Sequence, residues 1–579
     1  MRTLRWVITS SLVGALFAGT AMAQATTPSP VQQPSSIQQL AFQADDSAGY
    51  AVADQAPVGA AASPASPSNQ PPPAPPVTST TAPSVPPAET PPAKPEAAAP
   101  AAETPVPHAG EPCLRRFWDV EWDAWTKKGY DDTPDAPRRC NPPAPWGSPP
   151  YPGTDWQGYP LIGIPQSDIS GVMQTWINGG QYGDWFKQNH IGIDGWMTAS
   201  YNASNATFSN SPTSYFLVPN HLELDQLCFR VQKTYDTVQT DHIDWGFRSV
   251  ALFGMDYRYM VAGGWQPASD QLLLNNDLYG LDFTEQYAEV YFPHIGNGMV
   301  VRVGRWIACP DIEVQYSPDN YLASHSILFT YDTYTQTGIM FTFKINRQLM
   351  VQGAIESGTD MAPWYPGAVA TGFAGLRWVS EDNHDAFYTC LNNINAAEFR
   401  HLEVAGNAVG HDDYNYIVST YEHKFNENVH TATEAYFMWQ ENAVLGGTPT
   451  LGQVGTYGGG GGGLANVPVS QGGILLPGTS RAYGFLNYTE FGMANSGLGS
   501  WAKNDYICVR NEWWKDDRGM RSGVPGNYTS DTIGYCHNFN AALQVRPEFG
   551  FYRNWDTPAF DNSKLQNLYM FAVDFTYHW

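Results

Sequence analysis

The sequence predicts an all-β protein: a transmembrane antiparallel up-and-down β-barrel of about sixteen strands, preceded by a disordered Pro/Ala-rich segment. Three observations predict it. Many segments of the second half alternate apolar and polar residues, the connections between them alternate between short and long, and the final segment YMFAVDFTYHW is aromatic or apolar at every odd position. Outer-membrane barrels combine these features because strands meet lipid on one side and water on the other.

Residues 1–23 have the layout of a secretory signal peptide. Arg2 and Arg5 precede an apolar stretch, and Ala21-Met22-Ala23 offers a small-x-small cleavage site. No later stretch has the run of about 18 apolar residues that a transmembrane helix needs. We therefore expect a cleaved signal peptide, export, and insertion of strands into the cell outer membrane of a Gram-negative bacterium by its barrel-insertion machinery.

Composition narrows the partners. The net charge is −25, which excludes nucleic acid as a partner because phosphates demand basic patches. Aromatic residues make up 14% of the chain, with 20 Trp and 32 Tyr. Such residues gather where a barrel wall crosses the two membrane interfaces, so outer-membrane lipid is the expected partner.

Two segments separate the signal peptide from the barrel. Residues 24–112 are rich in Pro, Ala, Ser and Thr, a composition that cannot bury enough apolar surface to order itself. We expect a disordered periplasmic linker, either a spacer or a tether that reaches peptidoglycan. Residues 113–185 follow, with Cys113 and Cys140 around a Trp-, Arg- and Pro-rich stretch. They predict a small element that caps the barrel or plugs it.

The cysteines indicate disulfides rather than metal chemistry. Cys113 and Cys140 are the first candidate pair, and Cys508 and Cys536, on the inner face of one expected hairpin, are the second. The spacing of the cysteines matches neither a zinc finger nor CxxC, so we expect no metal site and no cofactor.

Residues 186–579 form the expected barrel. The strands are placed near 191–202, 220–234, 241–260, 281–293, 299–306, 338–345, 349–357, 370–380, 384–394, 413–425, 429–440, 480–492, 503–515, 532–543, 547–555 and 567–579. Short turns such as HIGNG, NRQ and VRP alternate with long loops such as 261–280 and 307–337. Porin-like barrels have short periplasmic turns and long outer loops. The connection 493–502 is the exception, because it should be short and is not.

The last strand carries the lipid-facing pattern most clearly. Its outward residues, which also form the expected membrane-insertion signal, are Tyr569, Phe571, Val573, Phe575, Tyr577 and Trp579. Asp574 and His578 fall on the opposite, lumenal face.

The same alternation places many charges in the lumen. The inward acids are Asp194, Glu223, Asp225, Asp244, Glu285, Glu289, Glu356, Glu434, Glu512 and Asp574, and the inward bases are Arg248, Arg302, Lys344, Arg377 and Arg510. A packed soluble core could not hold so many charges without partners, whereas a water-filled lumen can. Ten acids against five bases favour cations over anions, unless the bases line one wall and create a transverse field.

The stretches TEQYAEVYFPHIGNGMVVRVGRW, SPDNYLASHSILFTYDTYTQTGIMFTFKIN and VQGAIESGTDMAPW, together with NEWWKDDRGMRSGVPGNYT, resemble the putative β-barrel porin-2, OmpL-like family of outer-membrane proteins. The resemblance covers roughly residues 185–579 and leaves out the Pro-rich segment. It implies passive diffusion through a barrel, and it supplies no catalytic residues.

The loop 307–337 is the expected constriction, because the third long loop of sixteen-stranded porins often folds inward. It holds Asp311, Glu313, Asp319 and His325, and it follows Arg302 and Arg305. We expect acids and bases to face each other across this level, where size and field decide what passes. A solvated surface loop is the alternative.

Three other motifs favour ordinary roles. GHDDYNY lacks the spacing of a calcium loop and indicates a solvated loop. WWKDDRG indicates an aromatic girdle rather than a carbohydrate platform, and TYGGGGGGL lacks the ending of a phosphate loop. No nucleophile or zinc-protease motif is present, so an enzyme is not expected.

The sequence therefore predicts a porin: a passive channel for small hydrophilic solutes or ions with weak cation preference, and with homotrimer assembly as a further expectation. The alternative is a plugged barrel that anchors a structural or adhesive surface protein. The two differ in the lumen, because a plugged barrel needs paired interior charges.

Overall fold

The computed structural model describes residues 110–126, 162 and 172–579, with gaps inside the last range. The gaps are 214, 274–276, 309–311, 347, 366–367, 381–383, 396–399, 405–406, 412–413, 427, 447–473, 494–495, 503–504 and 540–541. The predicted signal peptide, almost all of the predicted linker, and the motif TYGGGGGGL lie outside the described residues. In the described part of the chain, no helix is both long and apolar enough to cross a membrane.

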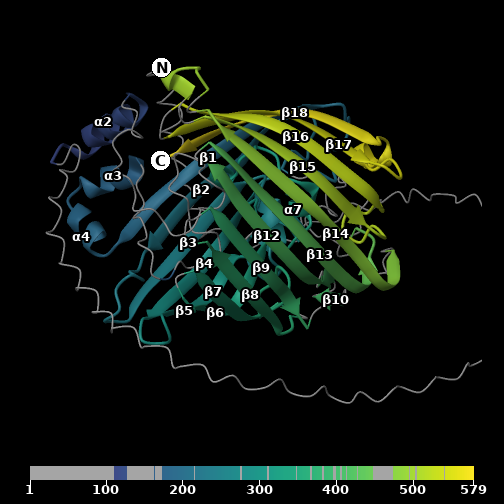
Figure 1. Cartoon of the computed structure of the whole chain (residues 1–579), viewed down its shortest axis with the longest axis horizontal. Helices are drawn as coiled ribbons and strands as arrows, with labels where there is room; N and C mark the ends of the chain where they lie inside the picture. Colours follow the sequence, from purple (N-terminus) through teal and green to yellow (C-terminus); the bar gives the residue numbers. More distant parts are fainter. Residues whose placement is uncertain are drawn as a thin grey trace, which may run out of the picture. The chain divides into compact units, whose positions relative to one another are not determined.

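Sixteen antiparallel strands close into one barrel, which confirms the predicted fold class (Figure 1). Each strand pairs with its neighbour in sequence, and β1 pairs with β18 to close the ring. The strands are β1 Ile191–Ser204, β2 Leu222–Lys233, β3 Asp244–Gly254, β4 Gly280–Phe292, β5 Met299–Ile307, β6 Thr335–Lys344, β7 Leu349–Glu356, β8 Thr371–Val379, β9 Asp385–Ile394, β12 Asn415–Asn426, β13 Val429–Val444, β14 Leu475–Gly492, β15 Tyr506–Asp516, β16 Gly526–Asn538, β17 Leu543–Asn554 and β18 Asn567–His578.

The remaining elements are short and lie in the connections or before the barrel. The hairpin β10 Arg400–Val404 and β11 Asn407–His411 forms a separate two-stranded sheet. The described helices are α2 Cys113–Thr126, α3 Val172–Asn178, α4 Gly183–Gln188, α5 Tyr257–Met260, α6 Ala268–Leu273, η2 Ser317–Asp319, α7 Ile327–Thr330, η5 Ser500–Ala502 and α9 Phe560–Ser563. The predicted strand 241–260 is therefore too long, because its end forms a turn and α5.

Two connections differ from the expectation at the periplasmic end. The residues 544–546 form no turn, because β17 begins at Leu543 and carries Pro547 opposite Val573. Proline lacks the N–H of the ladder, and the paired residues of β16 and β17 skip from Gly534 to His537 beside it. The long connection after β14 is real and contains η5, so it does not change the strand count.

The seam of the barrel is held by the last residues of the chain. Trp579 N donates to Gly195 O at 2.9 Å, and the His578 ring lies 3.1 Å from Asp194 Oδ2. A side chain at Gly195 would meet the Trp579 ring at 2.7 Å, so this position requires glycine. Tyr569, Phe571 and Phe575 face outward and are exposed, whereas Trp579 is 5% exposed. The low exposure of Trp579 arises because its ring packs against Gly195 of β1, on the face that also carries Tyr577.

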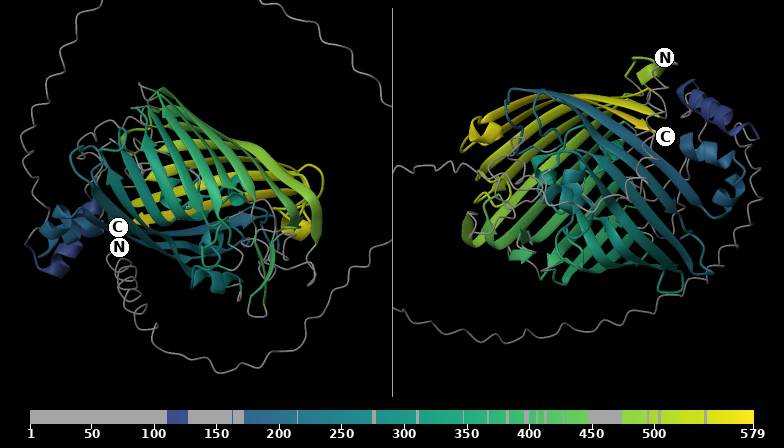
Figure 2. Two further views of the ribbon diagram at one scale, coloured as in Figure 1. Left: turned by 90° about the horizontal axis from the view of Figure 1, so that it is seen from below. Right: turned by 180° about the vertical axis from the view of Figure 1, so that it is seen from behind.

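A loop folds into the interior of the barrel (Figure 2). Its buried side chains pack against those of the wall. The largest cluster joins wall tyrosines such as Tyr388, Tyr416 and Tyr436 with residues from the loop between β5 and β6. Polar wall residues from every side are buried as well. The lumen of the described residues is thus largely occupied at this level.

Candidate functional site

The connection between β5 and β6 turns into the barrel instead of standing outside it. Its described residues 312–334 are nearly all buried, and η2 and α7 are its only regular structure. We call residues 312–334 the inward loop. Figure 2 shows α7 enclosed by the strands when the barrel is viewed from behind.

Three glutamates of the opposite wall hold the backbone of the inward loop. Glu434 of β13 accepts from Ile312 N at 2.9 Å. Glu512 of β15 accepts from the backbone N–H groups of residues 327 and 328, at 3.0 and 2.5 Å. Glu548 of β17 accepts from those of residues 323 and 324, at 2.8 and 3.1 Å. We call Glu434, Glu512 and Glu548 the glutamate clamps. Charge-assisted bonds to amides compensate a buried carboxylate without a cation.

One acid of the inward loop faces a base of the wall. Glu313 accepts from Arg510 Nη1 at 3.2 Å, from the Tyr488 hydroxyl at 2.6 Å and from Ser326 N at 2.8 Å. Arg510 also donates to Ser324 O at 2.8 Å. This cluster fastens the middle of the inward loop to β14 and β15 on the wall.

The outer loop after β15 also reaches the inward loop. Asp516 accepts from four successive backbone N–H groups, those of residues 519–522, at 2.8–3.0 Å. This turn directs Arg521 inward, where it donates to Tyr331 O at 2.8 Å and lies over the Tyr414 ring at 4.4 Å. Arg521 is 3% exposed. The turn that follows the predicted girdle motif WWKDDRG therefore makes a buried contact with the inward loop.

Most lumenal arginines are paired with acids of their own wall. The pairs with atoms 2.5–3.7 Å apart are Arg230–Asp194, Arg248–Glu285, Arg302–Glu289, Arg305–Asp282 and Arg546–Asp574. These arginines lie on β2, β3, β5 and β17, within the arc of the wall that runs from β17 through the β1–β18 seam to β5. Their acid partners lie on β1, β4 and β18 of the same arc, so each of these charges is neutralised locally.

Only some of the predicted constriction residues face each other in the structure. Glu313 faces Arg510, whereas Arg302 and Arg305 bind wall acids rather than the loop, because those acids lie on the adjacent strand. His325 is buried, with its ring stacked on Tyr215 at 3.7 Å. Burial lowers the pKa of His325 to about 3, so it is neutral at physiological pH.

The other predicted positions follow the alternation. Asp319, Glu356, Arg377, Glu434, Glu512 and Asp574 are buried inside the barrel, and Lys344 is half-buried. Asp311 lies outside the described residues. Sequence reasoning missed Arg230, Asp282, Asp516, Arg521, Arg546 and Glu548. The period-two pattern would have found Glu548 and Arg546 if VRP had not been taken as a turn.

The second disulfide prediction is wrong in this structure. Cys508 and Cys536 are buried free thiols, because Cys508 lies opposite Gly534 and Cys536 opposite Tyr506. Both do face inward, but they are offset by two residues. Cys113 is a free, exposed cysteine, and Cys140 lies outside the described residues.

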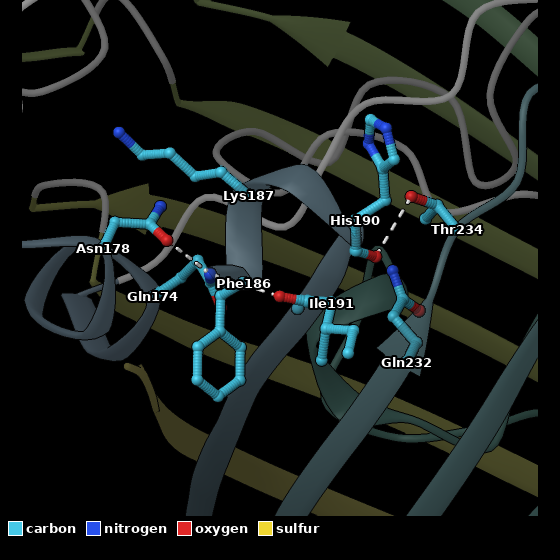
Figure 3. Close-up of a pocket in the computed structure, with 9 residues that line it drawn as sticks. Gln174, Asn178, Phe186, Lys187, His190, Ile191, Gln232 and Thr234 are labelled. Atoms are coloured by element: carbon cyan, nitrogen blue, oxygen red, sulfur yellow. Dashed lines mark hydrogen bonds between the residues drawn. The ribbon is translucent and has the colours of Figure 1, made fainter. Parts of the chain in front are cut away.

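The helices before the barrel attach to the start of β1. Gln174 of α3 donates to Asn178 Oδ1 at 2.9 Å (Figure 3). It also accepts from Ile193 N at 2.7 Å. A pocket of about 30 Å³ lies beside it, lined by Phe186 and His190 among others. Such a volume holds about one water molecule rather than a solute. Ile162, which precedes α3 in the chain, packs against Tyr235, Tyr291, Val300 and Met350.

In the described residues, no group of three or more His, Cys, Asp or Glu side chains is placed to hold a metal ion. The arrangement can therefore be read as a narrowed passage or a closed one, shaped by buried acids and by the inward loop.

The comparison with protein families identifies the barrel. The model of the putative β-barrel porin-2, OmpL-like family matches residues 190–579. The chain belongs to this family. The porin thus shares its outer-membrane barrel and its channel role with that family, and the resemblance noted in the sequence is confirmed.

Solved structures of the same barrel type are distant in sequence. The high-pH structure of Pseudomonas putida OprB is 9% identical, with a TM-score of 0.44, and the match covers 72% of this chain and 99% of that chain. The anion-selective porin from Comamonas acidovorans is 10% identical, with a TM-score of 0.40, and covers 67% and 99%. OmpT of Vibrio cholerae, in its trimer form, is 9% identical, with a TM-score of 0.38 and the same coverage. The search of curated proteins finds no match.

Proposed function

We propose that this porin is a passive diffusion channel for small hydrophilic solutes or ions, and that the inward loop sets its narrowest level. The observation that carries this proposal is the fastening of the inward loop to the wall by the glutamate clamps and Arg510. A loop held on several sides fixes the size and field of a passage at one level.

A weak cation preference is part of the proposal. Ten of the inward side chains predicted from the alternation are acids and five are bases, and this excess of acids supports the preference. The glutamate clamps contribute less, because loop amides compensate them.

The plugged barrel is the second candidate, and the paired arginines favour it. Interior charges in pairs, around a loop that fills the lumen, are what a closed anchor requires. The porin would then serve as a structural or adhesive anchor at the cell surface.

Single-channel recording of the purified porin in a planar lipid bilayer separates the two candidates. Discrete current steps in symmetric salt support the channel. A correctly folded barrel that carries no current contradicts it and supports the plug. We also propose that the porin is exported with cleavage of its signal peptide after Ala23. N-terminal sequencing of the purified porin tests this, because cleavage predicts Gln24 as the first residue.

A further inference from the structure

Three buried side chains on the inner face of β6, β7 and β8 carry oxygen atoms without partners. Gln336 is 1% exposed, and Glu356 and Thr371 are each 2% exposed. Among the described residues, none forms a hydrogen bond with Gln336 Oε1, with Thr371 Oγ1 or with either carboxylate oxygen of Glu356. Buried polar atoms of folded proteins nearly always have partners, so this group of oxygens requires an explanation. We call Gln336, Glu356 and Thr371 the oxygen cluster.

The pairing of the strands brings the oxygen cluster together. Glu356 lies directly opposite Thr371 on one side and opposite Gly338 on the other. Residues directly opposite each other have Cβ atoms about 4.5–5.5 Å apart. Gln336 is two residues from Gly338 and therefore points to the same face of β6. No side chain stands between Gln336 and Glu356, because a Cβ at Gly338 would lie 2.1 Å from Ile355 O.

The side chain of Gln336 extends over the strands that carry the other two members. Its Nε2 donates to Asn392 Oδ1 at 3.4 Å and to Asn393 Oδ1 at 3.3 Å, both on β9. In the sheet, β7 and β8 lie between β6 and β9 (Figure 1). Gln336 therefore crosses the inner face of β7 and β8, where Glu356 and Thr371 are found. The nitrogen of its amide is engaged, and its oxygen remains available.

The carboxylate of Glu356 has no partner of opposite charge among the described residues, and it forms no ion pair with them. Other acids of the lumen do have partners, since Glu313 faces Arg510 and Glu512 accepts from two backbone amides. A buried carboxylate without a partner is costly, so it takes up a proton or a cation. A protonated carboxyl donates only one hydrogen bond, whereas a cation contacts every oxygen of the cluster.

We propose that the oxygen cluster binds one small monovalent cation, of the class of Na⁺ and K⁺. Carboxylate, amide and hydroxyl oxygens are the ligands that hard cations prefer. The single carboxylate of the cluster balances one positive charge, whereas a divalent ion would leave a second charge uncompensated in the interior. This site goes beyond the channel proposal and does not depend on it, because a plugged barrel offers the same oxygens.

The linkage between cation binding and folding tests the proposal. The micelle-bound porin is unfolded in urea while K⁺, or separately Na⁺, is exchanged stepwise for the bulky cation N-methyl-D-glucamine at constant chloride. A cation that binds only the folded state raises the folding equilibrium constant about tenfold for each tenfold rise in its concentration above the dissociation constant. We expect this slope for the parent and almost none for E356Q. Equal slopes in the two proteins, or a parent that responds to neither cation, overturn the proposal.

The matched control is E490Q, which makes the same change at another buried glutamate. Glu490 lies on β14, and its carboxylate is 3.3 Å from His430 Nε2. E490Q therefore also removes one buried acid from the barrel, but it leaves the oxygen cluster intact. We expect E490Q to keep the slope of the parent. A slope lost equally in E490Q and E356Q would show a general effect of interior charge and would overturn the proposal.

Infrared difference spectroscopy reads the carboxyl groups directly and does not require E356Q to fold. Spectra are recorded while K⁺ replaces N-methyl-D-glucamine, for the parent and for T371V, which keeps the carboxyl group but loses one oxygen of the cluster. We expect a carboxyl band to change in the parent, and T371V to need a higher K⁺ concentration for the same change. No change in the parent, or the same concentration in both proteins, overturns the proposal. Neither experiment measures current, so a failure of the channel proposal is recorded separately.

Discussion

At the scale of single residues, the buried charges of this porin find two kinds of partner. Arginines form ion pairs with acids of the wall, as Arg546 does with Asp574. Backbone N–H groups of the inward loop donate hydrogen bonds to the glutamate clamps. The sequence predicts that these side chains point inward, because successive residues of a strand alternate between the lumenal and the lipid-facing side. It does not predict the amide partners, because these depend on the path of the inward loop.

Asp256 gives a prediction on pH. Burial raises its pKa to about 7, while the 2.8 Å bond from Gln226 Nε2 opposes the rise and the Asp574 charge adds to it. The folded state then holds a proton that the unfolded state has lost above about pH 4, so stability falls as pH rises toward 7. D256N removes that loss, with an upper limit of about 4 kcal/mol.

The measurement is urea unfolding of the micelle-bound barrel, followed by tryptophan fluorescence at pH 5 and pH 8. We expect the parent to lose stability between these values and D256N to lose less. An equal loss of stability in the parent and in D256N would show that ionisation of Asp256 does not destabilise the folded barrel.

The Arg546–Asp574 pair gives a second prediction. Removing one partner of a buried pair leaves an uncompensated charge and costs roughly 3–5 kcal/mol, whereas replacing both partners costs less. We therefore expect R546M to be less stable than the double variant R546M/D574L in the same urea titration. Arg546 also donates to Asn320 O, so R546M additionally loses a contact with the inward loop. Equal stability of the two variants would argue against ionic coupling at this site.

At the scale of elements, the inward loop has too little regular structure to satisfy its own backbone. η2 has three residues and α7 has four, so many N–H groups need partners from elsewhere. The wall supplies them as carboxylates from β13, β15 and β17. Sequence reasoning placed this loop inside by analogy with other porins, and the acids of the wall looked like channel charges rather than fasteners.

We expect the triple variant E434Q/E512Q/E548Q to loosen the inward loop. Glutamine keeps the size of each side chain but loses the charge that strengthens bonds to backbone amides. In planar bilayers the triple variant should show larger or noisier current steps than the parent. The control is E223Q, a buried acid that contacts no residue of the inward loop through a described hydrogen bond. Steps identical to those of the parent would mean that the clamps do not set the width.

At the scale of the whole molecule, the barrel was the most predictable feature. The alternation of apolar and polar residues indicates which side of each strand faces lipid, and the alternation of short and long connections indicates the two ends of the barrel. The hairpin of β16 and β17 was misplaced because Pro547 suggested a turn, although it sits in a strand that skips part of its pairing. The filling of the lumen could not be read from the strands, since contacts such as Arg521 with Tyr331 join segments far apart in sequence.

The uncompensated acids give a prediction about the molecule as a channel. Under a salt gradient, we expect the reversal potential of the parent to show a preference for cations. The double variant E223Q/E356Q should shift the reversal potential toward zero at high pH, where buried carboxyls without an arginine partner ionise. The double variant R302M/E289L serves as the control, because it removes a neutralised pair and leaves the net charge of the lumen unchanged. A parent that selects anions would contradict the proposed preference.

The pairing of β1 with β18 has a consequence for biogenesis. Before β18 pairs with it, β1 is an unpaired edge strand. Asp194 then lacks its contact with His578, and Gly195 O lacks the hydrogen bond from Trp579 N. A chain shortened at its end would keep this edge open, and open edges invite pairing with other chains. Closure of the barrel thus distinguishes complete chains from truncated ones. Quality-control proteases would meet an exposed strand edge on every truncated copy and none on a closed barrel.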